Sequence, residues 1–186
     1  MLPLIFGLAI FFGIHLLPSF TAYRQALVDR LGQASYRIGF SLISFVGLGL
    51  IIYGKGVSEF VFLWQPPRWG QYAPFILMLP ATVLFSAANM PGHIRRVVRH
   101  PMLIGIMLWS ASHLLANGDK ASILLFGSFA IFAIFDLFSV TLRSDRRKFS
   151  GEAGLEFDLI ALVVGVGLYA VIIYFHSNLF GPPALW

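Results

Sequence analysis

Long apolar runs separated by short polar segments make up most of the chain. Six of these runs hold 16 to 22 residues each: Leu2–Tyr23, Ile38–Tyr53, Tyr72–Met90, Pro101–Asn117, Ala121–Leu142 and Phe157–Phe175. A helix of this length reaches about 24 to 33 Å, close to the roughly 30 Å of a bilayer's hydrocarbon core. The runs lack the period-two alternation of a membrane β-barrel, so each is expected to be a helix. The pattern predicts an all-α transmembrane bundle of about six spans, with residues 1–186 forming a single domain.

The composition supports a multi-pass membrane protein. Hydrophobic residues make up 58% of the chain and charged residues only 11%, whereas a soluble domain carries about 25% charged residues. The first run has no basic segment before it and no small-residue cleavage site, so we expect it to be retained as the first helix. The chain contains no cysteine, which excludes disulfides, thiolate nucleophiles and iron–sulfur clusters.

Lysine and arginine residues fall mainly in alternate loops. Ten of the 13 lie in the loops after the first, third and fifth runs: Arg24, Arg30, Arg37, Arg95, Arg96, Arg99, Arg143, Arg146, Arg147 and Lys148. The other three are Lys55, Arg68 and Lys120. The positive-inside rule therefore predicts cytoplasmic basic loops and both termini on the outer (periplasmic) side. The pI near 9.9 then reflects topology and contact with membrane lipids, and no nucleic-acid partner is expected.

Two histidines fall within the apolar runs at similar depth. His15 precedes Arg24 by nine residues and His113 follows Arg99 by 14, which places them about 13 and 21 Å from the basic loops. Neutral imidazole is a good iron ligand, and axial haem ligation needs two such residues on different helices. Neither helix carries a carboxylate near its histidine, which argues against a zinc or di-metal carboxylate site. His15 and His113 are therefore candidate axial ligands of haem iron.

The same histidines could instead serve in helix packing. Ser110, Ser112 and Asn117 lie within about one helical turn of His113 and could form a local hydrogen-bond network with it. An intramembrane histidine without a ligand needs such partners, because burying a polar group alone is costly. The residues by themselves leave both interpretations open.

A basic cluster precedes the fourth run. Arg99 and His100 stand directly before Pro101, and proline in the first turn of a helix is a start signal. This tripeptide is therefore expected to mark the cytoplasmic beginning of the fourth span. Arg95, Arg96, Arg99 and His100 could hold a phosphate or carboxylate, or contact lipid headgroups, and we favour the lipid headgroups.

Three further ionisable residues lie within or beside the apolar runs. Asp136 lies seven residues before Arg143, so it is expected to pair with an arginine of the basic loops. His93 and His176 are expected to be bystanders at the two membrane interfaces.

Two stretches carry a resemblance to a known family. The runs 91-PGHIRRVVRHPMLIGIMLWSASHLLANGDKASILLFGSF-129 and 7-GLAIFFGIHLLPSF-20 closely resemble the NnrU family of bacterial inner-membrane proteins, named for a role in denitrification and nitric oxide metabolism. The resemblance covers nearly the whole chain and implies a single NnrU-like domain in the bacterial inner membrane. The same domain is similar to the 15-cis-zeta-carotene isomerase, a membrane haem b protein that isomerises a carbon–carbon double bond.

The resemblance to the isomerase implies haem b, with His113 and His15 matching its two axial ligands. It also implies an apolar polyene as substrate or, for redox chemistry, an electron-transfer partner. The segment 143-RSDRRKFSGEAG-154 departs from the isomerase's histidine-rich pattern, so the resemblance does not transfer the isomerase reaction or identify a catalytic residue.

Two other functions stay open. The run 99-RHPMLIG-105 resembles the S-adenosylmethionine-binding segment of membrane methyltransferases of the isoprenylcysteine type, but only 152-EAGLEF-157 stands where those enzymes have a Glu-Glu and tyrosine-rich segment. A non-enzymatic membrane component that supports assembly or signalling would use the histidines for packing alone.

Overall fold

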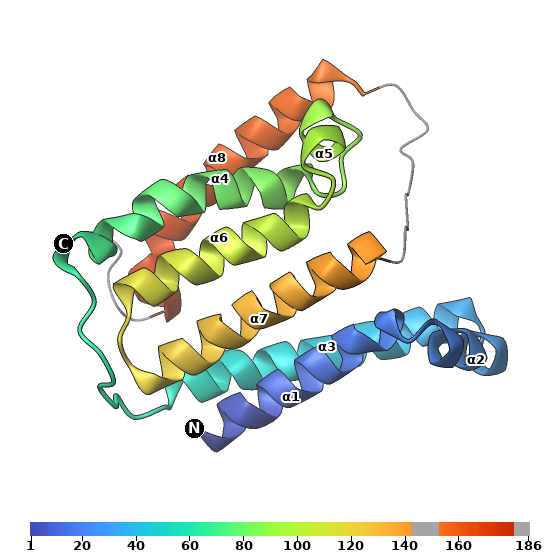
Figure 1. Ribbon diagram of the computed structural model, residues 1–186, viewed down its shortest axis with the longest axis horizontal. Coiled ribbons are helices and arrows are strands. Elements are labelled where there is room, and N and C mark those ends of the chain that lie inside the picture. Colours follow the sequence, from blue (N-terminus) through green and yellow to red (C-terminus); the bar gives the residue numbers. More distant parts are fainter. Residues whose placement is uncertain (143–152, 181–186) are drawn as a thin grey trace.

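The computed structural model describes residues 1–142 and 153–180, and in this part it is a bundle of helices without named strands (Figure 1). Each predicted apolar run overlaps one long helix: α1 (Leu2–Leu16), α3 (Gln33–Gly56), α4 (Ala73–Ala87), α6 (Pro101–Ala116), α7 (Lys120–Leu142) and α8 (Leu155–Phe180). The all-α prediction is confirmed for the described residues.

Within the described part of the chain, five helical segments are long and apolar enough to cross a membrane: Leu2–Ser19, Gln33–Gly56, Arg68–Ala87, Lys120–Thr141 and Leu155–Asn178. α6 is shorter, with 16 residues, or about 24 Å at helical rise. The structure therefore supports a membrane protein with five spans by length, and the count of about six stays a prediction.

α7 lies at the centre of the bundle. It packs against α6 on one side and against the closely paired α1 and α3 on the other (Figure 1). α4 packs between α6 and α8. Much of the apolar surface faces outward: Phe45, Ile76, Ile131 and Val163 are each 69–71% exposed. Exposed apolar area on this scale is typical of a surface that lipid covers.

The first helix ends earlier than the sequence predicted. α1 stops at Leu16, a 3₁₀ turn covers Leu17–Ser19, and the separate polar helix α2 runs from Thr21 to Leu31. Pro18 has no backbone N–H to donate to the preceding turn, and the missing hydrogen bond favours a break in the α-helix at this position. The predicted boundary at Tyr23 was therefore wrong, because hydropathy does not register this break.

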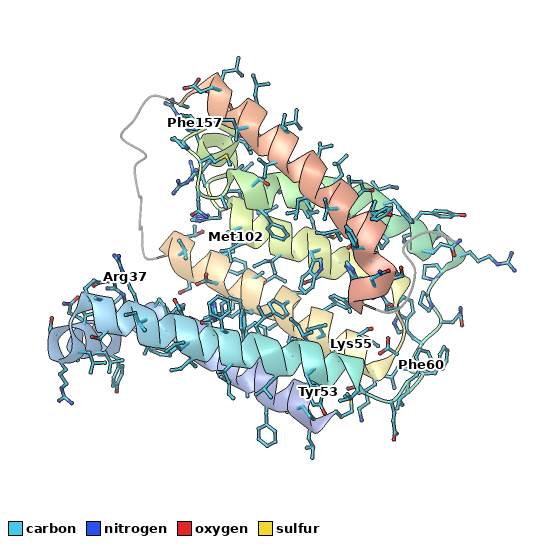
Figure 2. The ribbon with its side chains drawn as sticks, turned by 180° about the vertical axis from the view of Figure 1, so that it is seen from behind. Arg37, Tyr53, Lys55, Phe60, Met102 and Phe157 are labelled. Atoms are coloured by element: carbon cyan, nitrogen blue, oxygen red, sulfur yellow. The ribbon has the colours of Figure 1, made fainter. Side chains whose placement is uncertain are left out.

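The described basic loops gather at one end of the bundle. α2 and the short helix α5 (His93–Val98) lie at this end in Figure 1, and Figure 2 places Arg37 and Phe157 there, opposite Tyr53, Lys55 and Phe60. We call these the basic end and the outer end. The third predicted basic loop, with Arg143, Arg146, Arg147 and Lys148, lies outside the described residues. Which end faces the cytoplasm stays a prediction.

Candidate functional site

His15 sits in the last turn of α1. Its Nδ1 lies 2.7 Å from the carbonyl oxygen of Phe11, one turn earlier, and its ring stacks on the Phe11 ring with centroids 4.0 Å apart. Phe40 of α3 and Phe132 of α7 flank the imidazole at 5.2 and 6.2 Å. Asp136, one turn beyond Phe132, is close enough to act electrostatically on His15. The imidazole is thus held by aromatic rings from three helices. The expected pairing of Asp136 with a loop arginine stays a prediction.

His113 has a matching arrangement in the last turn of α6. Its Nδ1 lies 2.9 Å from the Trp109 carbonyl oxygen and 3.0 Å from the Ser112 hydroxyl. The ring stacks on Phe126 of α7 with centroids 4.5 Å apart. The Asn117 side chain donates to the His113 carbonyl oxygen at 2.9 Å. Of the expected network, Ser112 and Asn117 therefore contact this residue.

Ser110, the remaining member of the expected network, is fully buried, and its hydroxyl has no hydrogen-bond partner among the described residues. It lies on α6 three residues before His113 but makes no hydrogen bond to it. This part of the expected network does not form.

The two imidazoles share one hydrogen-bond pattern. In each, Nδ1 faces the carbonyl oxygen of the residue four positions earlier, and such a contact requires Nδ1 to carry the proton. The lone pair is then on Nε2, which is the atom that a metal ligand offers. Histidines that ligate metals are commonly oriented in this way by a hydrogen bond from the other ring nitrogen. The tautomer that axial ligation needs is therefore set by the helix backbone at both positions.

A continuous set of aromatic rings connects the two histidines. From the Phe11 ring beside His15, contacts lead to Phe129 at 5.5 Å, then to Trp109 at 5.2 Å, and from Trp109 to His113 at 5.7 Å. Along α7, His15 is level with Phe132 and His113 with Phe126, an offset of about 9 Å at helical rise. The two side chains belong to one cluster, but they do not face each other directly.

The two imidazole nitrogens of this cluster are suitable ligands for haem iron, but the packing holds the imidazole rings of His15 and His113 apart. Each imidazole holds Nδ1 against a backbone carbonyl, which leaves the Nε2 lone pair for a metal, and the surroundings are apolar, as a porphyrin face requires. The rings of Phe11, Phe129 and Trp109 occupy the region between the histidines. One iron can reach both Nε2 atoms only if these rings move aside.

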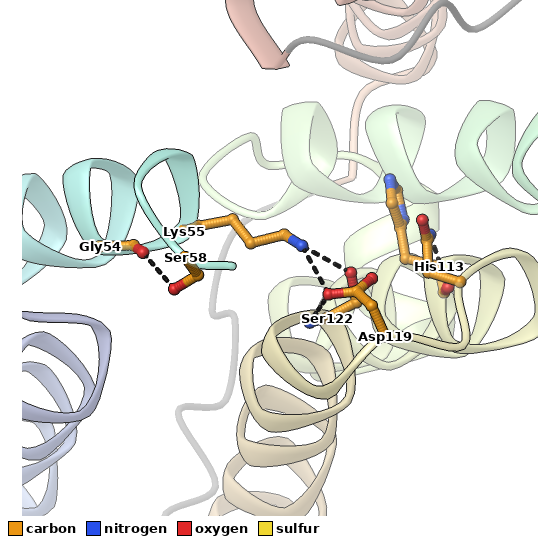
Figure 3. Close-up of polar contacts among 7 residues, drawn as sticks. Gly54, Lys55, Ser58, His113, Asp119 and Ser122 are labelled. Atoms are coloured by element: carbon orange, nitrogen blue, oxygen red, sulfur yellow. Dashed lines mark hydrogen bonds and ion pairs between the residues drawn. The ribbon is translucent and has the colours of Figure 1, made fainter. Parts of the chain in front are cut away.

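A second polar cluster lies at the outer end, and the sequence did not predict it. The Lys55 ammonium of α3 donates to Asp119 at 3.1 Å and to the Ser122 hydroxyl at 2.8 Å (Figure 3). Asp119 also accepts from the Ser122 backbone N–H at 3.0 Å, which makes it the N-cap of α7. An aspartate directly before an apolar run is a helix-start signal, so the cap was predictable. The partner 64 residues away was not.

The turn before α7 holds the outer connecting segment, residues 57–67, in place. The backbone N–H groups of Leu63 and Trp64 donate to the Gly118 carbonyl at 2.9 and 3.2 Å, and the Lys120 N–H donates to Val61 at 2.8 Å. A side chain on Gly118 would collide with the Trp64 carbonyl oxygen. The Asn-Gly-Asp sequence at 117–119 therefore has a structural explanation.

The Asp119 carboxyl contributes stability that depends on pH. Burial raises its pKa, but hydrogen bonds from Ser122 and Lys55 outweigh this and hold the pKa below its ordinary value of 3.8. A carboxyl whose pKa is lower in the folded state stabilises the protein above its unfolded pKa, and the contribution is lost as pH falls through the folded pKa.

Asp119→Ala is expected to lower the free energy of unfolding by about 2 kcal/mol at pH 7, because it removes both the helix cap and the charged partner of Lys55. Asp119→Asn keeps a capping oxygen and should cost less. Unfolding in mixed detergent micelles at pH 7 and near pH 3 measures both variants. The deficit of the asparagine variant should shrink at the lower pH, and an equal deficit at both values would contradict the assignment.

At the basic end, one carboxylate from α8 organises the arginine-bearing turn. Asp158 accepts from the backbone N–H groups of His93 and Ile94 at 3.0 and 2.9 Å, and from the His93 ring at 2.8 Å. It thereby caps α5, whose last turn carries Arg95 and Arg96. His93 is therefore not the bystander we expected, and the expected place of His176 at the other membrane interface stays a prediction.

The backbone positions Arg99 and His100 at the end of α5. Arg99 adopts a φ of 60°, unusual for a residue with a side chain, and α6 begins directly after His100, at Pro101. The helix start that the sequence predicted is confirmed. Binding of an anion or lipid headgroup by Arg95, Arg96, Arg99 and His100 stays a prediction.

Comparison with known proteins gives one match. A family described as NnrU protein matches residues 3–184, which is nearly the whole chain. No curated protein and no solved structure matches the chain. The chain therefore belongs to the NnrU protein family.

Proposed function

We propose that this protein binds haem b in the bacterial inner membrane through His15 and His113, and serves redox chemistry linked to nitrite and nitric oxide metabolism. The observation that carries the proposal is the shared orientation of the two imidazoles. Each directs its protonated Nδ1 to a backbone carbonyl and leaves Nε2 as a donor. Two histidines that serve only in packing have no need of the same tautomer.

Haem b held in this way would supply one-electron transfer at the iron. The chain's own residues would set the environment of the group. Phe11, Trp109, Phe126 and Phe129 would exclude water, and the Asp136 carboxylate would act on His15. Burial and nearby charge are the means by which a protein tunes haem chemistry. An apolar polyene substrate would enter the same cluster from the lipid in the isomerase-like variant of this function.

One observation favours a second candidate, a non-enzymatic membrane component. The rings of Phe11, Phe129 and Trp109 pack in contact with one another between the histidines, and each Nδ1 is already satisfied within its own helix. A protein that needs its histidines only for packing would have this arrangement permanently. Such a protein would be stable without haem and would support other membrane proteins in assembly or signalling.

Haem content separates the two candidates. The protein is purified in mild detergent from cells grown with ample haem precursor, and a pyridine haemochrome assay measures haem b per chain. We expect a Soret band and about one haem per chain. A stable, monodisperse protein without a Soret band would refute the haem proposal and support the non-enzymatic candidate.

A further inference from the structure

A groove opens at the outer end of the bundle, about one helical turn beyond His113 at the end of α6. It has a volume of about 580 Å³ and lies between the outer connecting segment and the turn from α6 to α7. Its lining includes Phe60, Phe62, Trp64, Arg68 and Asn117. The backbone hydrogen bonds from Leu63 and Trp64 to Gly118 hold its two walls together. The groove is therefore built into the fold.

The groove exposes aromatic side chains at the ends of membrane helices. Phe60 is 77% exposed and Phe62 57%. The connecting segment begins where the membrane-spanning α3 ends, at Gly56, and the next candidate span starts at Arg68. Residues at such positions lie at the level of the membrane surface, where aromatic side chains are enriched. Lipid, rather than water, is the neighbour that suits these rings.

Among the described residues that line the groove, Arg68 is the basic one and Asp119 the acidic one. Lys55 pairs with the Asp119 carboxylate at 3.1 Å, so this carboxylate already has a cationic partner. Arg68 is exposed, and no carboxylate of the described residues forms a salt bridge with it. Arginine binds phosphate oxygens through a planar fork of donors. An uncompensated guanidinium beside exposed rings matches a phosphate group attached to an apolar body.

We propose that this groove binds an anionic phospholipid of the outer leaflet. Arg68 contacts the lipid phosphate, and Phe60 and Phe62 contact the start of the acyl chains. Asn117 lines the groove and also donates to the His113 carbonyl oxygen, so the groove borders the surroundings of His113. None of the proposed lipid contacts involves His15, His113 or haem, so the proposal does not depend on haem binding.

Native mass spectrometry of the detergent-solubilised protein, titrated with phosphatidylglycerol, tests the proposal. Arg68→Gln is expected to weaken phosphatidylglycerol binding about tenfold, the effect of losing one charge-assisted hydrogen bond. Lys120→Gln is the matched control, because Lys120 lies at the same end but lines a neighbouring hollow. It should leave the affinity within about twofold. Equal weakening in both variants would show general attraction to a basic surface and would overturn the proposal.

Two further measurements identify the molecule that the groove binds. Phe60→Ala should weaken phosphatidylglycerol binding severalfold, because it removes an exposed apolar contact without disturbing the core. Inorganic phosphate at millimolar concentration should not compete with the lipid. Effective competition by phosphate, together with full binding by Phe60→Ala, would mean that the site takes a soluble anion, and the lipid assignment would fail.

Discussion

His113→Ala is expected to remove the haem absorption band from the purified protein. The substitution deletes one of the two nitrogen donors, and the neighbouring Trp109, Ser112 and Phe126 offer no side chain that can ligate haem iron. Haem per chain, measured as the pyridine haemochrome, should fall to less than about a tenth of the wild-type value, since loss of even an outer hydrogen-bond partner costs 10- to 100-fold in metal affinity.

The matched control is His100→Ala. His100 belongs to the same Arg-His-Pro run but lies at the other end of α6, about 20 Å along the helix from His113. It should keep a full Soret band. Retention of haem by His113→Ala, or equal loss in both variants, would refute the assignment of His113. His15→Ala should behave as His113→Ala does, which tests the second proposed ligand.

A folding measurement accompanies these variants. The His113 ring packs on Phe126 in the apolar cluster, so its removal has some cost in stability. The unfolding transition in mixed micelles, recorded for the haem-free forms, shows whether His113→Ala still folds. A folded variant that lacks haem would assign the loss to ligation.

Gly54→Ala is expected to separate α1 from α3 and to cost about 1–3 kcal/mol of unfolding free energy or more. An added Cβ at this position would collide with the backbone nitrogen of Leu4 and would lie 2.8 Å from the Pro3 carbonyl carbon. Because backbone atoms cannot rotate away as a side chain can, the two helices must shift. Unfolding in mixed micelles measures the cost.

Gly49→Ala is the control on the same helix. Gly49 is exposed, and a Cβ there would meet nothing within 4 Å. Alanine is a better helix former than glycine by about 1 kcal/mol, so this variant should be neutral or slightly more stable. A similar loss in both variants would mean that helix contact at Gly54 contributes nothing measurable.

The glycines show which helix contacts the sequence could predict and which it could not. Small residues recur in the second and sixth runs, and such residues permit close helix contacts. A Cβ added to Gly47 would lie 2.9 Å from the backbone of Phe11, and one added to Gly165 would lie 2.6 Å from the backbone of Val83, whereas a Cβ on Gly39, Gly49 or Gly167 would meet nothing within 4 Å. Which glycine faces a neighbour depends on how each helix is rotated about its axis, and hydropathy does not determine that rotation.

The polar clusters show the same limit. His15 and His113 were identified because ionisable residues are rare within apolar runs, and their depth followed from counting residues along each helix. The rings between them could not be predicted, since they come from α1, α6 and α7. Lys55 and Asp119 are charged residues at the ends of apolar runs, where charge is ordinary and predicts no contact. Their ion pair nevertheless links α3 to the start of α7.

The sequence by itself determined that this is an all-helical membrane protein, where its apolar segments lie and which loops are basic. These properties are local, because the length and hydropathy of one segment decide whether it suits a bilayer. The tertiary structure alone decided that Lys55 reaches Asp119 and that aromatic rings fill the region between the two histidines. Those features depend on contacts between residues up to a hundred or more positions apart, which form only when the helices pack at one register and one rotation.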